Sequence, residues 1–134
     1  MEWYDSYAIG VEAIDRQHKE LVRRISRLQM TLAGGDIKQE VAEAPRFLVD
    51  YSNHHFADEE QIMADSGYAE IGRHKGLHKR FVNDLVLILV DLKKGKAVDP
   101  LAFIDFLTDW LINHIRYEDK KIGKHLAAAA GQTE

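Results

Sequence analysis

The 134-residue chain contains no cysteine, which excludes disulfide bonds, thiolate metal sites and cysteine nucleophiles. It has only 2 prolines and 9 glycines, so few residues interrupt helices, and no alternating pattern typical of strands is present. The longest apolar stretch, residues 85–90, is far too short to cross a bilayer. The first ten residues carry Glu2 and Asp5 where a secretory signal would have basic and then apolar residues.

Charge narrows the function classes further. The net charge is −4 and the lysines and arginines are scattered, so no basic patch indicates nucleic-acid binding. With 46% hydrophobic and 30% charged residues, the composition is that of an ordinary globular domain. We therefore expect a cytoplasmic, monomeric protein with one domain over residues 1–134, no membrane segment and no nucleic-acid partner.

Four segments carry apolar residues or histidines at spacings of three and four, the pattern of a helix with one buried face. The predicted helices span about residues 14–33, 36–65, 70–94 and 99–122. Asp36 and Asp99-Pro100 are typical helix starts, and Gly34-Gly35, Ser66-Gly67 and Gly123 are typical stops. Pro45 should kink the second helix or mark where its main part begins.

Short loops between helices of this length favour an all-α, antiparallel up-down-up-down four-helix bundle. Residues 1–13, with Trp3, Tyr4 and Tyr7, form an extended N-terminal arm that we expect to pack across it. The alanine-rich end, from residue 127 on, is predicted to fray.

Seven potential metal ligands lie on these helices at corresponding heights. In an up-down bundle, the starts of the first and third helices share one end with the ends of the second and fourth. At about 1.5 Å per residue, all seven fall within roughly 5 to 15 Å of that end. They are His18, His55, Glu59, His74, His78, His114 and Asp119.

The local spacings suit coordination in two cases and less well in a third. Residues i and i+4 project from one helix face, as do His55 with Glu59 and His74 with His78. His114 and Asp119 are five apart, which offsets them by about 140° on an α-helix. That offset is tolerable if the carboxylate bridges to a second metal or if the helix is locally distorted.

Each piece also has an ordinary structural explanation. A single histidine on a helix stripe is more often packed and hydrogen-bonded than bound to metal, and i,i+4 pairs are common on exposed faces. Taken together, however, seven polar groups buried without partners would cost several kcal/mol each, which a metal would offset. The rival pair His54 and Asp58 continues onto a polar face, so we place it outside the site. His125 lies past the predicted helix stop and is expected to be exposed, and Glu60 and Glu118 are interpreted as solvated charges.

Seven ligands exceed what one ion takes, so two metals are implied. Imidazoles suit iron, copper, zinc or nickel, and bridging carboxylates favour iron. Zinc usually settles at four ligands and copper prefers tetragonal sets. A pair of iron ions is therefore our first choice.

At these residues the sequence resembles the hemerythrins, and especially bacterial hemerythrin-like domains. The matching stretches are residues 10–18 (GVEAIDRQH), 55–63 (HFADEEQIM), 74–78 (HKGLH) and 110–119 (WLINHIRYED), and together they reach across nearly the whole chain. The resemblance implies a non-haem di-iron centre bridged by Glu59, Asp119 and an oxo or hydroxo group. It further implies that His74, His78 and His114 hold one iron, and that His18 and His55 hold the other and leave it a position for O2.

The resemblance implies reversible O2 binding for storage, delivery or scavenging, with no catalytic residues. Trp110, Leu111 and Ile115, beside the last histidine, are candidates for a dry O2 pocket, although they serve equally well as plain bundle core. Two alternatives stay open. One is an O2- or redox-sensing domain in which the aromatic arm moves, and the other is peroxidase-type detoxification at the same metal. The sequence indicates no particular protein partner.

Overall fold

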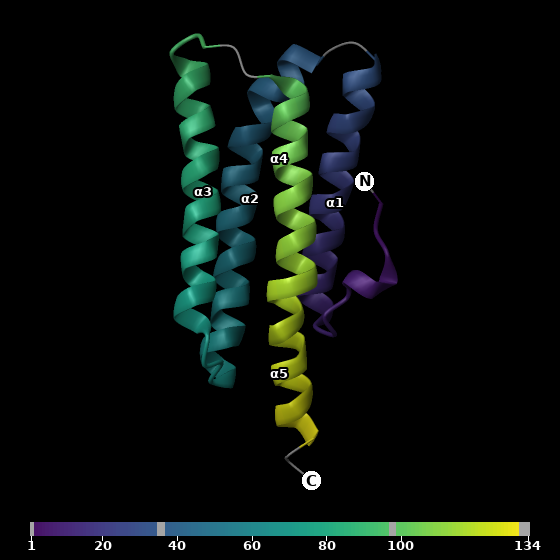
Figure 1. The fold of residues 1–134 in the computed structure, drawn as a ribbon, viewed down its shortest axis with the longest axis vertical. Coiled ribbons are helices and arrows are strands. Elements are labelled where there is room, and N and C mark those ends of the chain that lie inside the picture. Colours follow the sequence, from purple (N-terminus) through teal and green to yellow (C-terminus); the bar gives the residue numbers. More distant parts are fainter. Residues whose placement is uncertain (1, 35–36, 97–98, 132–134) are drawn as a thin grey trace.

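The computed structural model describes residues 2–34, 37–96 and 99–131, and in this part of the chain all regular structure is helical. Helices α1 to α4 lie side by side and alternate in direction (Figure 1), which confirms the all-α, up-down-up-down bundle. The elements are the short 3₁₀ helix η1 (Asp5–Tyr7), α1 (Glu12–Gly34), α2 (Ile37–Ser66), α3 (Ile71–Lys93), α4 (Pro100–Asn113), the π-helix η2 (His114–Asp119) and α5 (Lys120–Gly131).

Most helix boundaries follow from the predicted signals. The Asp99 carboxylate accepts a hydrogen bond from the Leu101 amide at 3.1 Å, and Pro100 takes the first helical position, as predicted. At Gly67 the chain turns with φ at 69°, a conformation that favours glycine. Helix α2 runs through Pro45 from Ile37, so the idea that its main part begins at the proline is wrong. The predicted start at Asp36 lies outside the described residues.

The apolar stripes pack into a core along the half of the bundle nearer the α1–α2 and α3–α4 connections. A second, smaller cluster of Met63, Tyr68 and Ile122 lies at the other end, where α2, α5 and the α2–α3 turn meet. The buried histidines described below come between these two apolar regions. The larger core includes Leu21, Ile25, Leu28, Leu48, Phe81, Leu85, Phe103, Ile104, Leu107 and Leu111.

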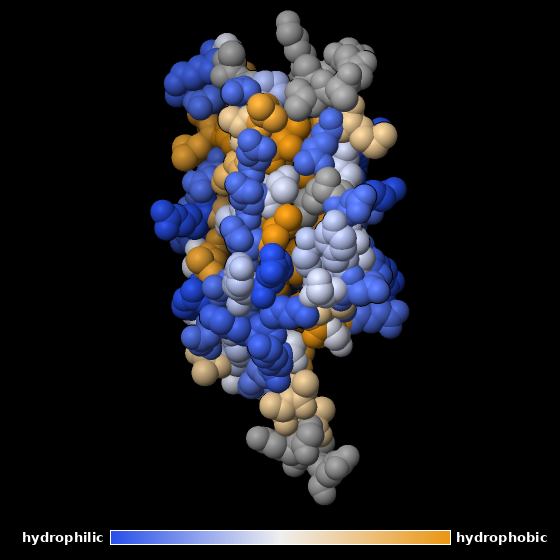
Figure 2. Space-filling model, turned by 45° about the vertical axis from the view of Figure 1, so that its right-hand side comes forward, coloured by the Kyte–Doolittle hydropathy of each residue, from blue (hydrophilic) through white to orange (hydrophobic). Residues whose placement is uncertain are grey.

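The surface is hydrophilic over most of the lower half of the bundle in the face shown in Figure 2, while apolar side chains are exposed mainly toward the upper half. Within the described residues, every helix lacks a stretch that is both long and apolar enough to cross a membrane.

The fourth helix does not stop at Gly123, and the predicted fraying tail is wrong up to Gly131. Helices α4, η2 and α5 form one continuous rod that extends beyond the other helices (Figure 1). Gly123 is needed for packing instead, because a Cβ atom placed there would lie 2.1 Å from the carbonyl oxygen of Ile9. A glycine is therefore present in α5 where the backbone of the arm crosses it.

The N-terminal arm packs on the bundle as predicted, although it contains the 3₁₀ turn η1 and is not extended throughout. Tyr7 is buried and meets the Trp3 ring edge-to-face, with centroids 5.6 Å apart. The Asp15 carboxylate of α1 accepts hydrogen bonds from the amides of Ile9 at 2.7 Å and Gly10 at 3.2 Å. The arm is thus fixed to both α1 and α5.

Replacing Gly123 with alanine should displace the arm and destabilise the fold by about 1–3 kcal/mol, the usual cost of overpacking. Gly76→Ala is the matched control, because Gly76 lies inside α3 and a Cβ atom added there would meet nothing within 4 Å. That control should stabilise the helix by about 0.5–1 kcal/mol. Urea unfolding followed by circular dichroism measures both. Equal stabilisation by the two substitutions would contradict the close contact with Ile9.

Candidate metal centre

The structure brings all seven predicted ligands into one buried cluster. His18 comes from α1, His55 and Glu59 from α2, His74 and His78 from α3, and His114 and Asp119 from η2. Their exposed fractions run from 0% for His18, Glu59 and Asp119 to 4% for His114. The ligand atoms form two groups, in each of which all atoms lie within 4.8 Å of one another.

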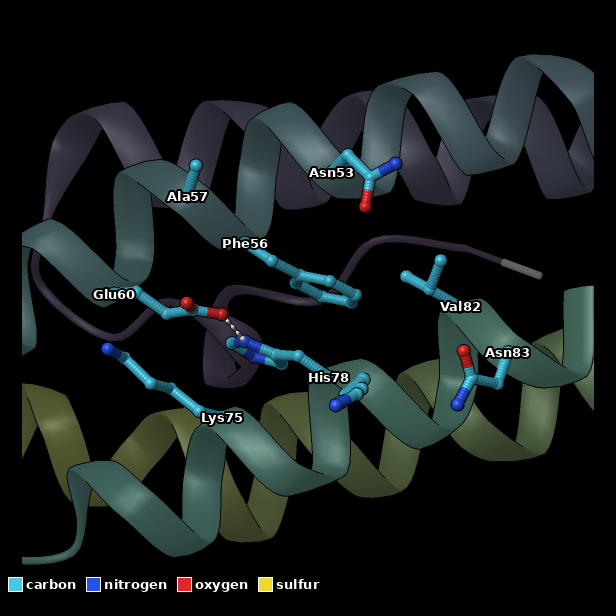
Figure 3. Close-up of a pocket in the computed structure, with 9 residues that line it drawn as sticks. Asn53, Phe56, Ala57, Glu60, Lys75, His78, Val82 and Asn83 are labelled. Carbon is cyan, nitrogen blue, oxygen red and sulfur yellow. Dashed lines mark hydrogen bonds and ion pairs between the residues drawn. The ribbon is translucent and has the colours of Figure 1, made fainter. Parts of the chain in front are cut away.

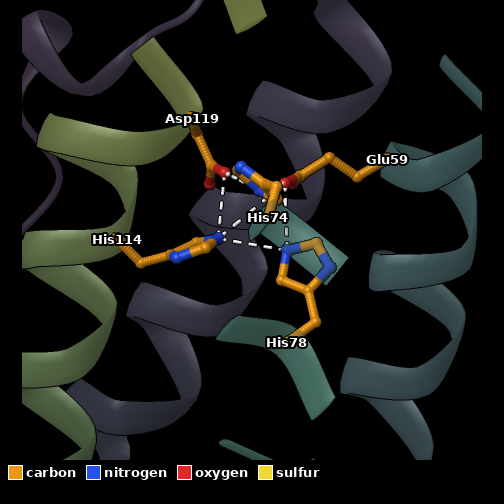
Figure 4. A group of neighbouring side chains, drawn as sticks. All are labelled: Glu59, His74, His78, His114 and Asp119. Carbon is orange, nitrogen blue, oxygen red and sulfur yellow. Dashed lines mark hydrogen bonds and ion pairs between the residues drawn. The ribbon is translucent and has the colours of Figure 1, made fainter. Parts of the chain in front are cut away.

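Glu59 and Asp119 belong to both groups, because each carboxylate presents its two oxygens to different histidines. Glu59 Oε1 lies 2.6 Å from His74 Nε2, and Glu59 Oε2 lies 3.2 Å from His55 Nε2. Asp119 Oδ1 lies 3.0 Å from His114 Nε2, and Asp119 Oδ2 lies 3.0 Å from His18 Nε2. The first group, shown in Figure 4, consists of Glu59, Asp119, His74, His78 and His114, and the second of Glu59, Asp119, His18 and His55.

The π-helix η2 explains how His114 and Asp119 serve one site. A π-helix closes its hydrogen bonds between residues i and i+5, so side chains five apart come to lie on the same face. The six residues of η2 begin with His114 and end with Asp119. The sequence spacing had left a bridging carboxylate or a distorted helix as alternatives, and the structure contains the distortion.

The cluster fits cations better than it fits internal hydrogen bonding. Among the described residues, Glu59 Oε2 and both Asp119 oxygens are buried and accept no hydrogen bond. Two pairs of imidazole nitrogens also face each other at 3.1 Å, His18 with His55 and His78 with His114. Buried acceptors without donors are costly, and nitrogen and carboxylate oxygen are the donor atoms that iron binds.

Burial and neighbouring charges shift the pKa values of several side chains in the cluster. Burial lowers the pKa of His18, but the negatively charged carboxylates of Asp119 and Glu59 close to its Nε2 outweigh this effect and raise the pKa to about 9. Burial also lowers the pKa of His74, and the same two carboxylates outweigh it and raise the pKa to about 9. Burial and the Glu59 charge raise the pKa of Asp119, yet His114 and His18 bring it down to about 2. At neutral pH both carboxylates are therefore ionised, and a metal ion would have to compete with protons for His18 and His74.

Within the described residues, two of the predicted ligands are held from outside by residues on α1 and α2. The outer nitrogen of His55, Nδ1, lies 2.7 Å from Gln17 Oε1, and Gln17 Nε2 donates to Asp58 at 2.7 Å. His78 Nδ1 lies 2.9 Å from Glu60 Oε2. Carboxylate and amide oxygens only accept, so both imidazoles carry their proton on Nδ1 and direct the Nε2 lone pair inward.

Two glutamates that we interpreted as solvated charges have partners instead. The interpretation is wrong for Glu60, because it holds His78. It is also wrong for Glu118, which accepts a hydrogen bond from Arg73 at 3.0 Å and so ties η2 to α3. That hydrogen bond lowers the pKa of Glu118. The sequence carried a weak signal for Glu60, since it neighbours a ligand on α2, but only the packing of α3 shows what it faces.

The remaining two histidines differ from the ligand set. His54 is exposed, which confirms the predicted register of α2. His125 is half-buried, so its predicted exposure is wrong, because α5 continues past Gly123. Its Nε2 lies 2.9 Å from the carbonyl oxygen of Ser66, which ties α5 to the end of α2.

Aromatic rings cover the histidines on the side of the larger core. Trp110 stacks on His114, with centroids 4.4 Å apart and planes at 12°. Phe56, which the sequence analysis missed, stacks on His78 at 3.8 Å and 4°. Leu111 and Ile115 are buried in the core cluster. The assignment of Trp110, Leu111 and Ile115 to an O2 pocket stays a prediction.

The raised pKa values predict how stability of the chelated, metal-free protein depends on pH. Histidines raised from 6.5 to about 9 stabilise the fold fully below pH 6.5, and this contribution disappears as the pH rises through 9. We expect the urea midpoint of metal-free protein to be lower at pH 9.5 than at pH 6.5. The urea midpoint of the metal-loaded protein should fall less between these two pH values, because bound metal keeps the imidazoles neutral at both. Equal midpoints for the metal-free protein would contradict the assigned charge balance.

Known proteins share both the sequence pattern and the fold. The family model of the hemerythrin HHE cation binding domain matches residues 9–126. A bacteriohemerythrin of Pseudomonas aeruginosa (strain LESB58) is 37% identical over 118 residues, which cover 87% of this chain and 75% of that protein. A bacteriohemerythrin of Methylococcus capsulatus (strain Bath) is 33% identical over 126 residues, covering 91% and 92%. A crystal structure of wild-type hemerythrin has a TM-score of 0.85 at 31% identity, covering 94% of this chain and 97% of that one. The chain therefore belongs to the hemerythrin family.

Proposed function

We propose that the protein binds O2 reversibly at a pair of iron ions held by the seven clustered residues. The observation that carries the proposal is the sharing of Glu59 and Asp119 between two groups of histidines. His74, His78 and His114 would hold one iron, and His18 and His55 the other. Both carboxylates, with an oxo or hydroxo group, would bridge the pair.

The two groups provide unequal numbers of protein ligands, which supports O2 binding at one iron. One group offers five ligand atoms and the other four, counting Glu59 and Asp119 in both. Small-molecule chemistry requires a coordination position that the protein leaves free, and the group with His18 and His55 leaves more of them. When bound, the iron pair supplies the electrons that O2 binding requires.

The surroundings favour reversible binding over bond cleavage. Five imidazoles and only two carboxylates place little negative charge on the metals, which disfavours high oxidation states. The ligands are nearly inaccessible, and Phe56 and Trp110 cover His78 and His114 with flat apolar surfaces. Excluding water in this way limits side reactions of a reactive centre.

One observation favours redox or O2 sensing as a second candidate. The arm contacts Gly123, one helical turn beyond the bridging residue Asp119, and is also fixed by Asp15 at the start of α1. A change at the metals that moves Asp119 would therefore reach the arm through α5. In this function, oxidation of the centre would persist after O2 is removed.

An absorption spectrum separates these functions. Protein reduced without air should contain about two iron ions per chain, and on exposure to air it should develop charge-transfer bands that disappear on deoxygenation. Bands that persist would favour sensing or detoxification, whereas zinc or a single iron would contradict the proposal. Glu59→Ala should remove the paired-iron bands. His54→Ala, a change on the exposed face of α2, is the control and should leave them intact.

A further inference from the structure

The two histidines with an outer hydrogen-bond partner are held by groups of different charge. His78 donates to the Glu60 carboxylate at 2.9 Å, whereas His55 donates to the neutral amide oxygen of Gln17 at 2.7 Å. Among the described residues, His18 Nδ1 is buried with no partner at all. The outer contact of His78 is therefore to a charged group, whereas that of His55 is to a neutral one.

A charged acceptor makes a stronger hydrogen bond than a neutral one and increases the basicity of the imidazole that donates to it. His78 should consequently bind its metal more strongly than His55 does. The effect depends on limited screening of the charge, and Glu60 is only 28% exposed. Phe56 stacks on the ring of His78 and holds it in the plane that both Glu60 and the cluster require.

Glu60 and His78 lie on the wall of a groove of about 400 Å³ between α2 and α3 (Figure 3). The side chain of Glu60 thus reaches from the groove toward the outer edge of the His78 ring, with its carboxylate directed at His78 Nδ1. Substitutions at Glu60 can be accommodated there without opening the apolar core.

On the side of His55, the nearest outer negative charge is that of Asp58, which is separated from the imidazole by Gln17. Gln17 lies between His55 and Asp58, accepting from the first and donating to the second at 2.7 Å each. The charge of Asp58 therefore reaches His55 only through an amide. Exchanging the chemistry of Gln17 and Asp58 would place the charge on His55 while keeping both hydrogen bonds.

We propose that Glu60 and Gln17 are positioning residues that make the two metal positions unequal. Glu60 strengthens retention of the metal bound by His74, His78 and His114, and the neutral Gln17 leaves the metal bound by His18 and His55 more labile. The inference rests on the proposed function, because it requires two irons divided between these groups. The labile position is also the one assigned to O2.

Iron release to a ferrous chelator tests this with the intact, iron-loaded protein. After anaerobic reduction, the wild type should release its two irons in a fast and a slow phase of equal amplitude. Glu60→Gln keeps the size and the acceptor but removes the charge. It should accelerate the slow phase about tenfold, at the low end of the effect of such outer partners, and leave the fast phase unchanged.

The double variant Gln17→Glu/Asp58→Asn supplies the opposite change. It moves the charge next to His55 and should slow the fast phase about tenfold, a gain in retention that misfolding cannot produce. Asp58→Asn alone is the matched control and should leave both phases near their wild-type rates.

Each outcome decides the matter. Wild-type protein with fewer than two irons would overturn the proposed function and this inference together. Two irons with a single release phase, or phases that the Glu60 and Gln17 variants leave unchanged, would overturn the inference alone. Acceleration of both phases together by Glu60→Gln would indicate general loosening and would also overturn it.

Discussion

The cluster of predicted ligands is centred on two buried carboxylates that each face in two directions. Glu59 and Asp119 have no exposed surface, and each points one oxygen at each group of histidines. Seven polar side chains gathered in this way would be costly in an apolar interior without a compensating positive charge. Cations between the two groups would satisfy acceptors that the protein itself leaves without donors. The candidate metal centre and the helix packing are therefore parts of one arrangement.

The rest of the structure keeps those carboxylates in place. Apolar clusters lie on both sides of the polar cluster, the larger along the bundle and the smaller around Met63 and Ile122. The π-helix brings Asp119 onto the face of His114, and Arg73 holds the neighbouring Glu118. Beyond it, α5 receives the N-terminal arm at Gly123. Each of these contacts fixes the orientation of a helix that carries predicted ligands, or its position along the bundle axis.

Much of this was predictable from the sequence, because helix periodicity and chain direction together determine which residues share an end. The four helices and the common level of the seven ligands followed from that rule, and His54 was correctly placed outside. The errors concern contacts between segments distant in sequence. Gly123 has the appearance of a helix stop, yet Ile9 determines its role. Glu60 has the appearance of a surface charge, yet its partner His78 lies on another helix. The local pattern showed that His114 and Asp119 fit an α-helix poorly, but did not decide how the mismatch is resolved.

The most direct measurement of the central claim is anomalous X-ray scattering at the iron edge from crystals of the iron-loaded protein. We expect two iron peaks, one beside His74, His78 and His114 and the other beside His18 and His55, with Glu59 and Asp119 each bonded to both. A single peak would contradict it. Two peaks of which Glu59 or Asp119 contacts only one would contradict it equally, because the two positions would then share no common carboxylate pair.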